Sequence, residues 1–209
     1  MKFNWIKKIN SKKSIIAKDN CRFLKEIIFL DFDGVMTSVK NGTSFLCCNT
    51  NSYHIDGEIK SRFETLFIVF PNLKVVLSTA WCNRGSLDDP TPNWPWKGID
   101  MPTPLPELYK WLESHNVFYG TVSTEKNDEH GDHITKHDKI KKWLIEHEDI
   151  IDKKARIVVL DDDASDYNNL RAINRLKLKR GKIKFFQTNY EVGFSKEDFK
   201  EVFKFLSKN

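Results

Sequence analysis

The sequence has no long apolar run and few cysteines. No hydrophobic stretch approaches the roughly 18 residues that would indicate a membrane-spanning helix, and the first residues, MKFNWIKKIN, lack the apolar core of a secretory signal. The 209 residues include four cysteines, no two of which form a C-x-x-C pair. This spacing predicts no zinc site of that kind and favours free thiols in a reducing compartment. We therefore expect a cytoplasmic protein with no membrane span.

A strong overall charge is also absent, but the charge is unevenly spread. The formal net charge is +5, and residues 1–25 carry eight Lys or Arg side chains against a single acid, Asp19. We predict two parts, a basic leader over 1–25 and one domain over 26–209. A basic leader suits contact with nucleic acid, an anionic membrane surface or an acidic partner. The alternative is a solvated segment without a partner.

From about residue 26 onward, short apolar runs alternate with helical periodicity. The first run, IIFL at 27–30, is short and branched, as buried parallel strands are. Further strands are predicted at 74–77, 117–122, 156–160 and 182–186, and helices around 59–67, 106–112, 135–144 and 195–206. This alternation predicts an α/β fold in which a mostly parallel sheet lies between two layers of helices. The stretch 83–106, rich in Pro, Gly, Asp and Trp, predicts a long irregular loop.

Polar and acidic residues follow several of the predicted strands. Asp31 and Asp33 come after the first strand, Ser78 after the second, and Asp161 and Asp162 after the fourth. Ligands of open parallel sheets bind beyond the carboxyl ends of the strands, so these side chains are expected to converge. Several carboxylates at one edge repel one another unless a cation lies among them, and hard oxygen ligands favour Mg²⁺. The pattern is typical of phosphoryl transfer, in which catalysis is mainly positioning and charge neutralisation.

Three of these strand ends resemble motifs of the haloacid dehalogenase (HAD) superfamily. IIFLDFDGVMT resembles the first motif, VVLST the second and RIVVLDDDASD the fourth, in the order found in that family. The resemblance implies a Rossmann-like, three-layer α/β/α fold and a Mg²⁺-dependent phosphatase. In that mechanism Asp31 attacks phosphorus, Asp33 acts as acid and then base, and Ser78 hydrogen-bonds a phosphoryl oxygen. Mg²⁺ would be held by Asp31, the backbone carbonyl of Asp33, and Asp161 or Asp162.

The resemblance also implies a lysine that stabilises the phosphoryl charge. Lys136 is the first choice, because it lies at the predicted start of a helix in TKHDKIKKWL, and Lys139 is the reserve. Thr135 is predicted to cap that helix, with Asp138 three residues later. Asp166 is a candidate for orienting the metal site.

The spacing of the motifs leaves no room for a full cap domain. The segments between Asp31 and Ser78, and between Ser78 and Lys136, are taken up by the predicted helices, strand and loop. Capless members of the superfamily tend to act on large substrates. The segments LSTAW, WLIEH, LDDDASD and FQTNYEVGFS are similar to the small capless domain of multifunctional RNA-repair proteins. One departure is Cys82, which stands where an Arg often follows the Trp, with Arg84 two residues later.

Three functions remain open at this point. The first is a phosphomonoesterase acting on a macromolecular phosphate, such as a nucleic-acid end. The second is a phosphatase for a small metabolite or nucleotide, screened by the 83–106 loop. The third, of another class, is an inactive HAD-like protein that binds a partner. Intact Asp31 and Asp33 favour an enzyme, because a binding protein needs neither.

Overall fold

The computed structural model describes residues 23–41, 43, 55–79, 105–122, 134–165 and 181–208. Most of the predicted leader, nearly all of the predicted 83–106 loop, and Asp166 lie outside these residues. Among the described residues, no helix combines the length and the hydropathy needed to cross a membrane.

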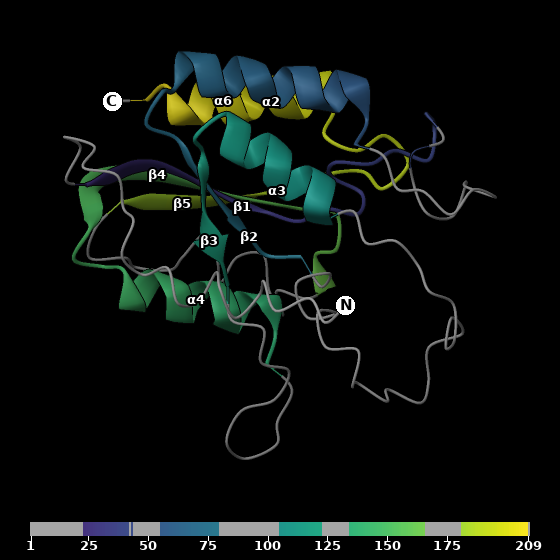
Figure 1. Ribbon diagram of the computed structural model, residues 1–209. Helices are drawn as coiled ribbons and strands as arrows, with labels where there is room; N and C mark the ends of the chain where they lie inside the picture. Colours follow the sequence, from purple (N-terminus) through teal and green to yellow (C-terminus); the bar gives the residue numbers. More distant parts are fainter. Residues whose placement is uncertain are drawn as a thin grey trace, which may run out of the picture.

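The described strands form one five-stranded sheet (Figure 1). Its strands are β1 (Leu24–Leu30), β2 (Lys74–Leu77), β3 (Phe118–Thr121), β4 (Ile151–Asp161) and β5 (Lys182–Gln187). The strand order is β3-β2-β1-β4-β5, and every one of these pairings is parallel. The chain moves outward from β1 to β3 and then returns to place β4 beside β1. The topological switch point, where ligands bind in such sheets, therefore lies between β1 and β4.

Helices cover both faces of the sheet, as Figure 1 shows. α2 (Gly57–Val69), α3 (Leu105–Ser114) and α6 (Lys196–Leu206) lie over one face, and α4 (Lys136–Glu146) lies under the other. Three of these helices begin at residues whose side chains accept hydrogen bonds from first-turn N–H groups, namely Asp56, Thr135 and Ser195. The predicted three-layer α/β/α architecture is confirmed.

The central strand β1 shows why the sequence folds in this way. Ile28 and Leu30 belong to the cluster beneath α2, α3 and α6, whereas Ile27 and Phe29 belong to the cluster above α4. Because successive strand side chains point to opposite faces, a run of four apolar residues fills both clusters at once. All four side chains are 0% exposed. The ring of Phe29 meets Trp143 of α4 edge-on at 5.2 Å between centroids.

The element boundaries agree closely with the sequence pattern, with two differences. β2 matches the predicted 74–77 strand, but β4 begins at Ile151 instead of residue 156 because Ile151 pairs with Leu24 of β1. α3 begins at Leu105, so the end of the predicted loop is helical. Between β1 and β2, the described residues form one helix, α2, and no separate domain.

A buried arginine ties the end of α6 to the sheet. The side chain of Arg156, on β4, is 9% exposed. Its Nε donates a hydrogen bond of 2.7 Å to the carbonyl of Lys208, and its guanidinium carbon lies 5.7 Å from the centre of the Phe205 ring. The last described turn is thereby held against β4.

Candidate active site

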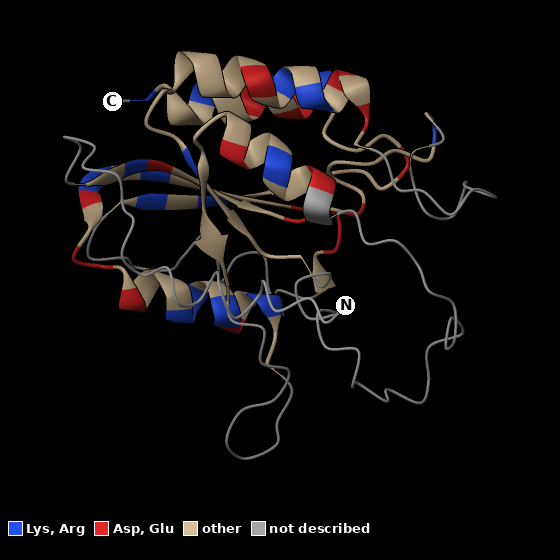
Figure 2. Cartoon of the chain, viewed as in Figure 1, with Lys and Arg blue, Asp and Glu red and all other residues tan. Residues whose placement is uncertain are grey.

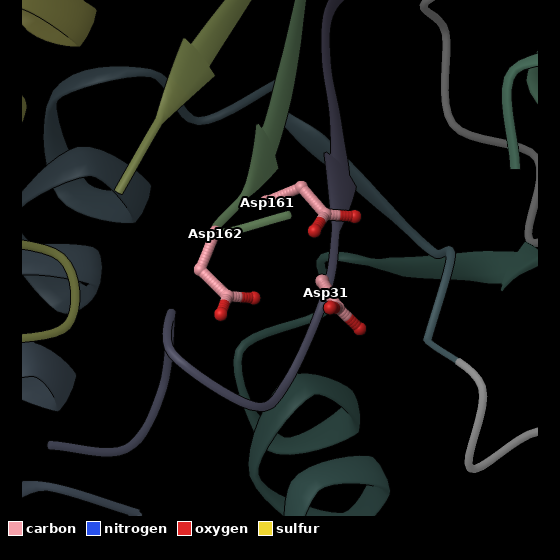
Figure 3. A group of neighbouring side chains, drawn as sticks. All are labelled: Asp31, Asp161 and Asp162. Atoms are coloured by element: carbon pink, nitrogen blue, oxygen red, sulfur yellow. The ribbon is translucent and has the colours of Figure 1, made fainter. Parts of the chain in front are cut away.

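Three carboxylates converge at the switch point between β1 and β4 (Figure 3). Leu30 pairs with Leu160 in the parallel register, so the residues that follow them, Asp31 and Asp161, lie next to each other. One oxygen from each of Asp31, Asp161 and Asp162 lies within 4.8 Å of the others. The convergence expected from the strand ends is therefore present.

A lysine from the opposite side of the site joins this group. The Nζ of Lys136 donates hydrogen bonds of 2.9 Å to Asp31 and 2.9 Å to Asp161. Lys136 is the first residue of α4, whose start is fixed by Thr135, because the Thr135 side chain accepts the N–H of Asp138 at 3.2 Å. The reserve candidate, Lys139, lies one turn later and is buried, 7% exposed. Lys136 is the candidate lysine that reaches both carboxylates.

Negative side chains outnumber positive ones in this group. Asp31 is 5% exposed and Asp161 0%. Burial opposes the charge on Lys136, but the ion pairs with Asp31 and Asp161 outweigh it and hold the pKa of this lysine above its usual value. Burial, followed by the negative charge of Asp31, raises the pKa of Asp162 to about 6. One ammonium group thus faces three carboxylates. The raised pKa of Asp162 means that ionising this third carboxyl group costs free energy.

This imbalance tests whether a metal ion fits the site. Carboxylate oxygens are the hard donors that Mg²⁺ prefers. Burial is the main reason that the pKa of Asp162 is raised, and a divalent cation would offset the negative charge of Asp31 that adds to it. The three aspartates therefore form a donor set that could bind a metal ion of this kind.

The chain after Asp31 turns sharply. Residues 31–36, the acidic turn, do not continue the strand, since the N–H of Met36 donates to the Phe32 carbonyl at 2.8 Å. Asp33 therefore lies in a turn and not on an extended strand end. Its carboxylate is outside the three-aspartate group, although its charge contributes to the raised pKa of Asp162.

Gly34 allows the acidic turn to approach Asp162. Its φ of +63° lies in the left-handed region, where a side chain is strained. A Cβ at this position would also lie 2.4 Å from Cγ of Asp162. Glycine is therefore required both by the backbone conformation and by the close contact with an acid of the site.

Ser78 brings a buried hydroxyl to the same edge. It follows β2, and its N–H donates to the carbonyl of Leu30 at 2.9 Å. The side chain is 2% exposed, and its Oγ has no hydrogen-bond partner in the part of the chain that the structure describes. An unpaired buried hydroxyl is costly. A bound anion at the site would satisfy it.

The sequence reasoning missed Thr188. This residue follows β5 and is 4% exposed. Its N–H donates to the Asp161 carbonyl at 3.0 Å, and its Oγ1 donates to the Gly34 carbonyl at 2.7 Å. The segment FQTNYEVGFS is similar to RNA-repair phosphatase domains, but only the fold shows that its threonine joins the acidic turn to the end of β4.

Comparison with known proteins identifies the family. The family model described as the HAD domain in Swiss Army Knife RNA repair proteins matches residues 27–199. None of the curated proteins matches the chain. Two solved structures resemble it, both of the HAD domain of effector protein Lem4 from Legionella pneumophila. One has 16% identity and a TM-score of 0.48 and covers 88% of this chain and 97% of that chain. The other, an inactive mutant, has 18% identity and a TM-score of 0.42 and covers 88% and 95%.

The family match spans β1 to α6, and so includes the acidic turn, Ser78, Lys136 and the aspartates at the end of β4. The chain therefore belongs to the family of HAD domains found in Swiss Army Knife RNA repair proteins and has the Rossmann-like fold of the HAD superfamily.

Proposed function

We propose that the protein is a Mg²⁺-dependent phosphomonoesterase that works through an aspartyl-phosphate on Asp31. The observation that carries the proposal is the setting of Asp31. It is 5% exposed, lies at the switch point beside the carboxylates of Asp161 and Asp162, and accepts a hydrogen bond of 2.9 Å from Lys136. A buried carboxylate with a fixed cationic partner in such a position is a typical nucleophile for phosphoryl transfer.

The reaction would proceed in two displacements. In the first, an oxygen of Asp31 forms a bond to phosphorus while the bond to the leaving oxygen breaks, and Asp33 gives that oxygen a proton. In the second, Asp33 takes a proton from a water molecule, whose oxygen attacks the phosphorus of the aspartyl-phosphate. Inorganic phosphate leaves, and the carboxylate of Asp31 is restored.

The remaining side chains would stabilise charge. Asp31, Asp161 and Asp162, with the backbone carbonyl of Asp33, would hold Mg²⁺, which supplies charge neutralisation for the transferred group. Lys136 would keep Asp31 oriented and pair with the phosphoryl oxygens. The hydroxyl of Ser78, which has no partner among the described residues, would donate to one of those oxygens.

For the substrate we propose a phosphate on a macromolecule, with a nucleic-acid end as the first candidate. The family name supports RNA. Between β1 and β2 the described residues form one helix, α2, and no cap domain, and capless members of the superfamily tend to act on large substrates. The alternatives are a small-metabolite or nucleotide phosphatase and an inactive binding protein.

The test is hydrolysis of a generic aryl phosphate with Mg²⁺ or EDTA, followed by RNA with phosphorylated ends, phosphopeptides and nucleotides. We expect Mg²⁺-dependent turnover that Asp31→Asn abolishes. Asp152→Asn is the matched control, because it makes the same change at the start of β4, the end of that strand away from the site. Full activity in Asp31→Asn would refute the nucleophile. A wild-type protein inert on every substrate would favour the binding-protein alternative.

A further inference from the structure

The segment that follows β5 is hydrogen-bonded to the acidic turn and to the chain that leaves this turn. This back segment, residues 188–194, has a closed shape of its own, since the N–H groups of Val192 and Gly193 both donate to the Asn189 carbonyl, at 3.0 and 2.7 Å. It contacts the acidic turn and the chain that follows it at several points. It is therefore placed to fix where that turn lies.

One end of the back segment is anchored beyond the site. The N–H of Phe194 donates to the Val35 carbonyl at 2.9 Å, and the Phe194 ring is 0% exposed and packs 4.8 Å from that of Phe63. At Gly193, which has a φ of +69°, a Cβ would lie 2.6 Å from the carbonyl oxygen of Thr37. The back segment and residues 35–37 therefore pack closely, backbone against backbone.

The carbonyl of Glu191 forms the middle of the attachment. It accepts the hydroxyl of Ser38 at 3.0 Å and the N–H of Lys40 at 2.9 Å. These bonds hold the chain that leaves the acidic turn.

The other end is Thr188, and here the back segment reaches the metal-binding edge. Through its N–H it bonds the carbonyl of Asp161, and through Oγ1 it bonds the carbonyl of Gly34. Beside it, Nε2 of Gln187 donates to the carbonyl of Asp162 at 3.1 Å. Gly34 already lies against the Asp162 side chain. Thr188 therefore links the acidic turn to the end of β4, and the distance between these two segments determines how the three carboxylates are arranged.

We propose that Thr188 is a positioning residue for the carboxylate group, and that its hydroxyl sets the geometry in which Asp31 and Asp162 hold the metal ion and Asp31 receives the phosphoryl group. This inference rests on the proposed phosphatase function. The hydroxyl donates to a backbone carbonyl and not to one of the three carboxylates. It acts through Gly34, because without the hydroxyl the buried carbonyl of Gly34 would lose this hydrogen-bond donor.

The experiment compares Thr188→Val with Thr188→Ser. Valine keeps the shape of the side chain and removes the donor, whereas serine keeps the donor. Groups that orient metal ligands typically change metal affinity or activity by about 10–100-fold when removed. For Thr188→Val we expect a kcat about tenfold lower or more, little change in substrate KM, and Mg²⁺ binding weakened about tenfold by titration calorimetry. Thr188→Ser should stay within about twofold of wild type.

Val202→Ala serves as the stability control. Val202 is a 0% exposed core residue of α6, so its truncation lowers the melting temperature without touching the site. If Thr188→Val melts earlier but keeps wild-type kcat and Mg²⁺ affinity, as Val202→Ala should, the hydroxyl is merely structural and the inference fails while the phosphatase proposal stands. If wild type neither binds Mg²⁺ nor turns over any substrate, both fail together.

Discussion

The two ends of β4 carry charge in opposite ways. At its start, Lys153 and Lys154 are exposed to solvent. At its end, Asp161 is 0% exposed and is held by Lys136. Figure 2 shows further Lys and Arg colouring on β4 and β5. A solvated charge costs the fold almost nothing, whereas a buried one persists only with a compensating partner. The buried end therefore carries charge at the expense of stability, as the proposed function requires.

The largest effect is expected from removing the partner at the buried end. Lys136→Met leaves Asp31 and Asp161 without their ammonium, and breaking a buried pair costs about 3–5 kcal/mol. In EDTA the melting temperature should fall strongly, with partial recovery in Mg²⁺, and kcat should fall about 100-fold or more. Lys142→Met, on the exposed face of the same helix, is the control. Unchanged melting and turnover in Lys136→Met would contradict the ion-pair account.

The next effect tests the close contact beside the buried end. Gly34→Ala places a methyl group 2.4 Å from Cγ of Asp162 and strains the left-handed backbone, which costs about 1–2 kcal/mol. We expect turnover to fall about tenfold or more, because the carboxylate is displaced. Gly57→Ala is matched, since a Cβ there meets nothing within 4 Å. Equal effects of the two substitutions in steady-state assays would show that the contact is unimportant.

A smaller effect, of opposite sign, sharpens the comparison. The pKa of Asp162 is raised to about 6 from its usual 3.8, so ionising this group costs stability as the pH rises through that interval. In EDTA near neutral pH, Asp162→Asn should melt about 2–4 °C higher, corresponding to about 1 kcal/mol. The gain should disappear near pH 4. Mg²⁺ should raise the melting temperature of the Asp162→Asn variant by less than it raises that of wild type in the same assay. A lower melting point in EDTA would refute this reading of the charge imbalance.

The smallest effect belongs to the solvated end. Lys154→Ala should change stability by less than about 0.5 kcal/mol and leave kcat unaltered, because the side chain is exposed. Urea unfolding and a turnover assay measure both. A loss of activity would show that the two ends of β4 are coupled.

The fold was largely predictable because buried parallel strands are read directly from apolar runs. The KVVL strand matches β2, and the alternation of Ile27 and Ile28 between two clusters follows from the strand period. The start of β4 was not predictable, since IDKK has no apolar pattern and is a strand only through its pairing.

The candidate site was predictable where it lies at strand ends and a capped helix start. Asp31, Asp161, Asp162 and Lys136 come together, although their catalytic roles stay predictions. The turned path of Asp33 depends on the hydrogen bond between Met36 and Phe32, which no spacing reveals. Thr188 resembles any polar loop residue until the fold brings Gly34 against it.

The bond from Arg156 to Lys208 has a consequence for where the chain can be shortened. A protein trimmed before Lys208 would lose the carbonyl that accepts the arginine Nε. The 9% exposed side chain of Arg156 would then have an unsatisfied donor between β4 and α6. The last described residues are thus part of the folded unit, although they lie far along the sequence from every residue of the site.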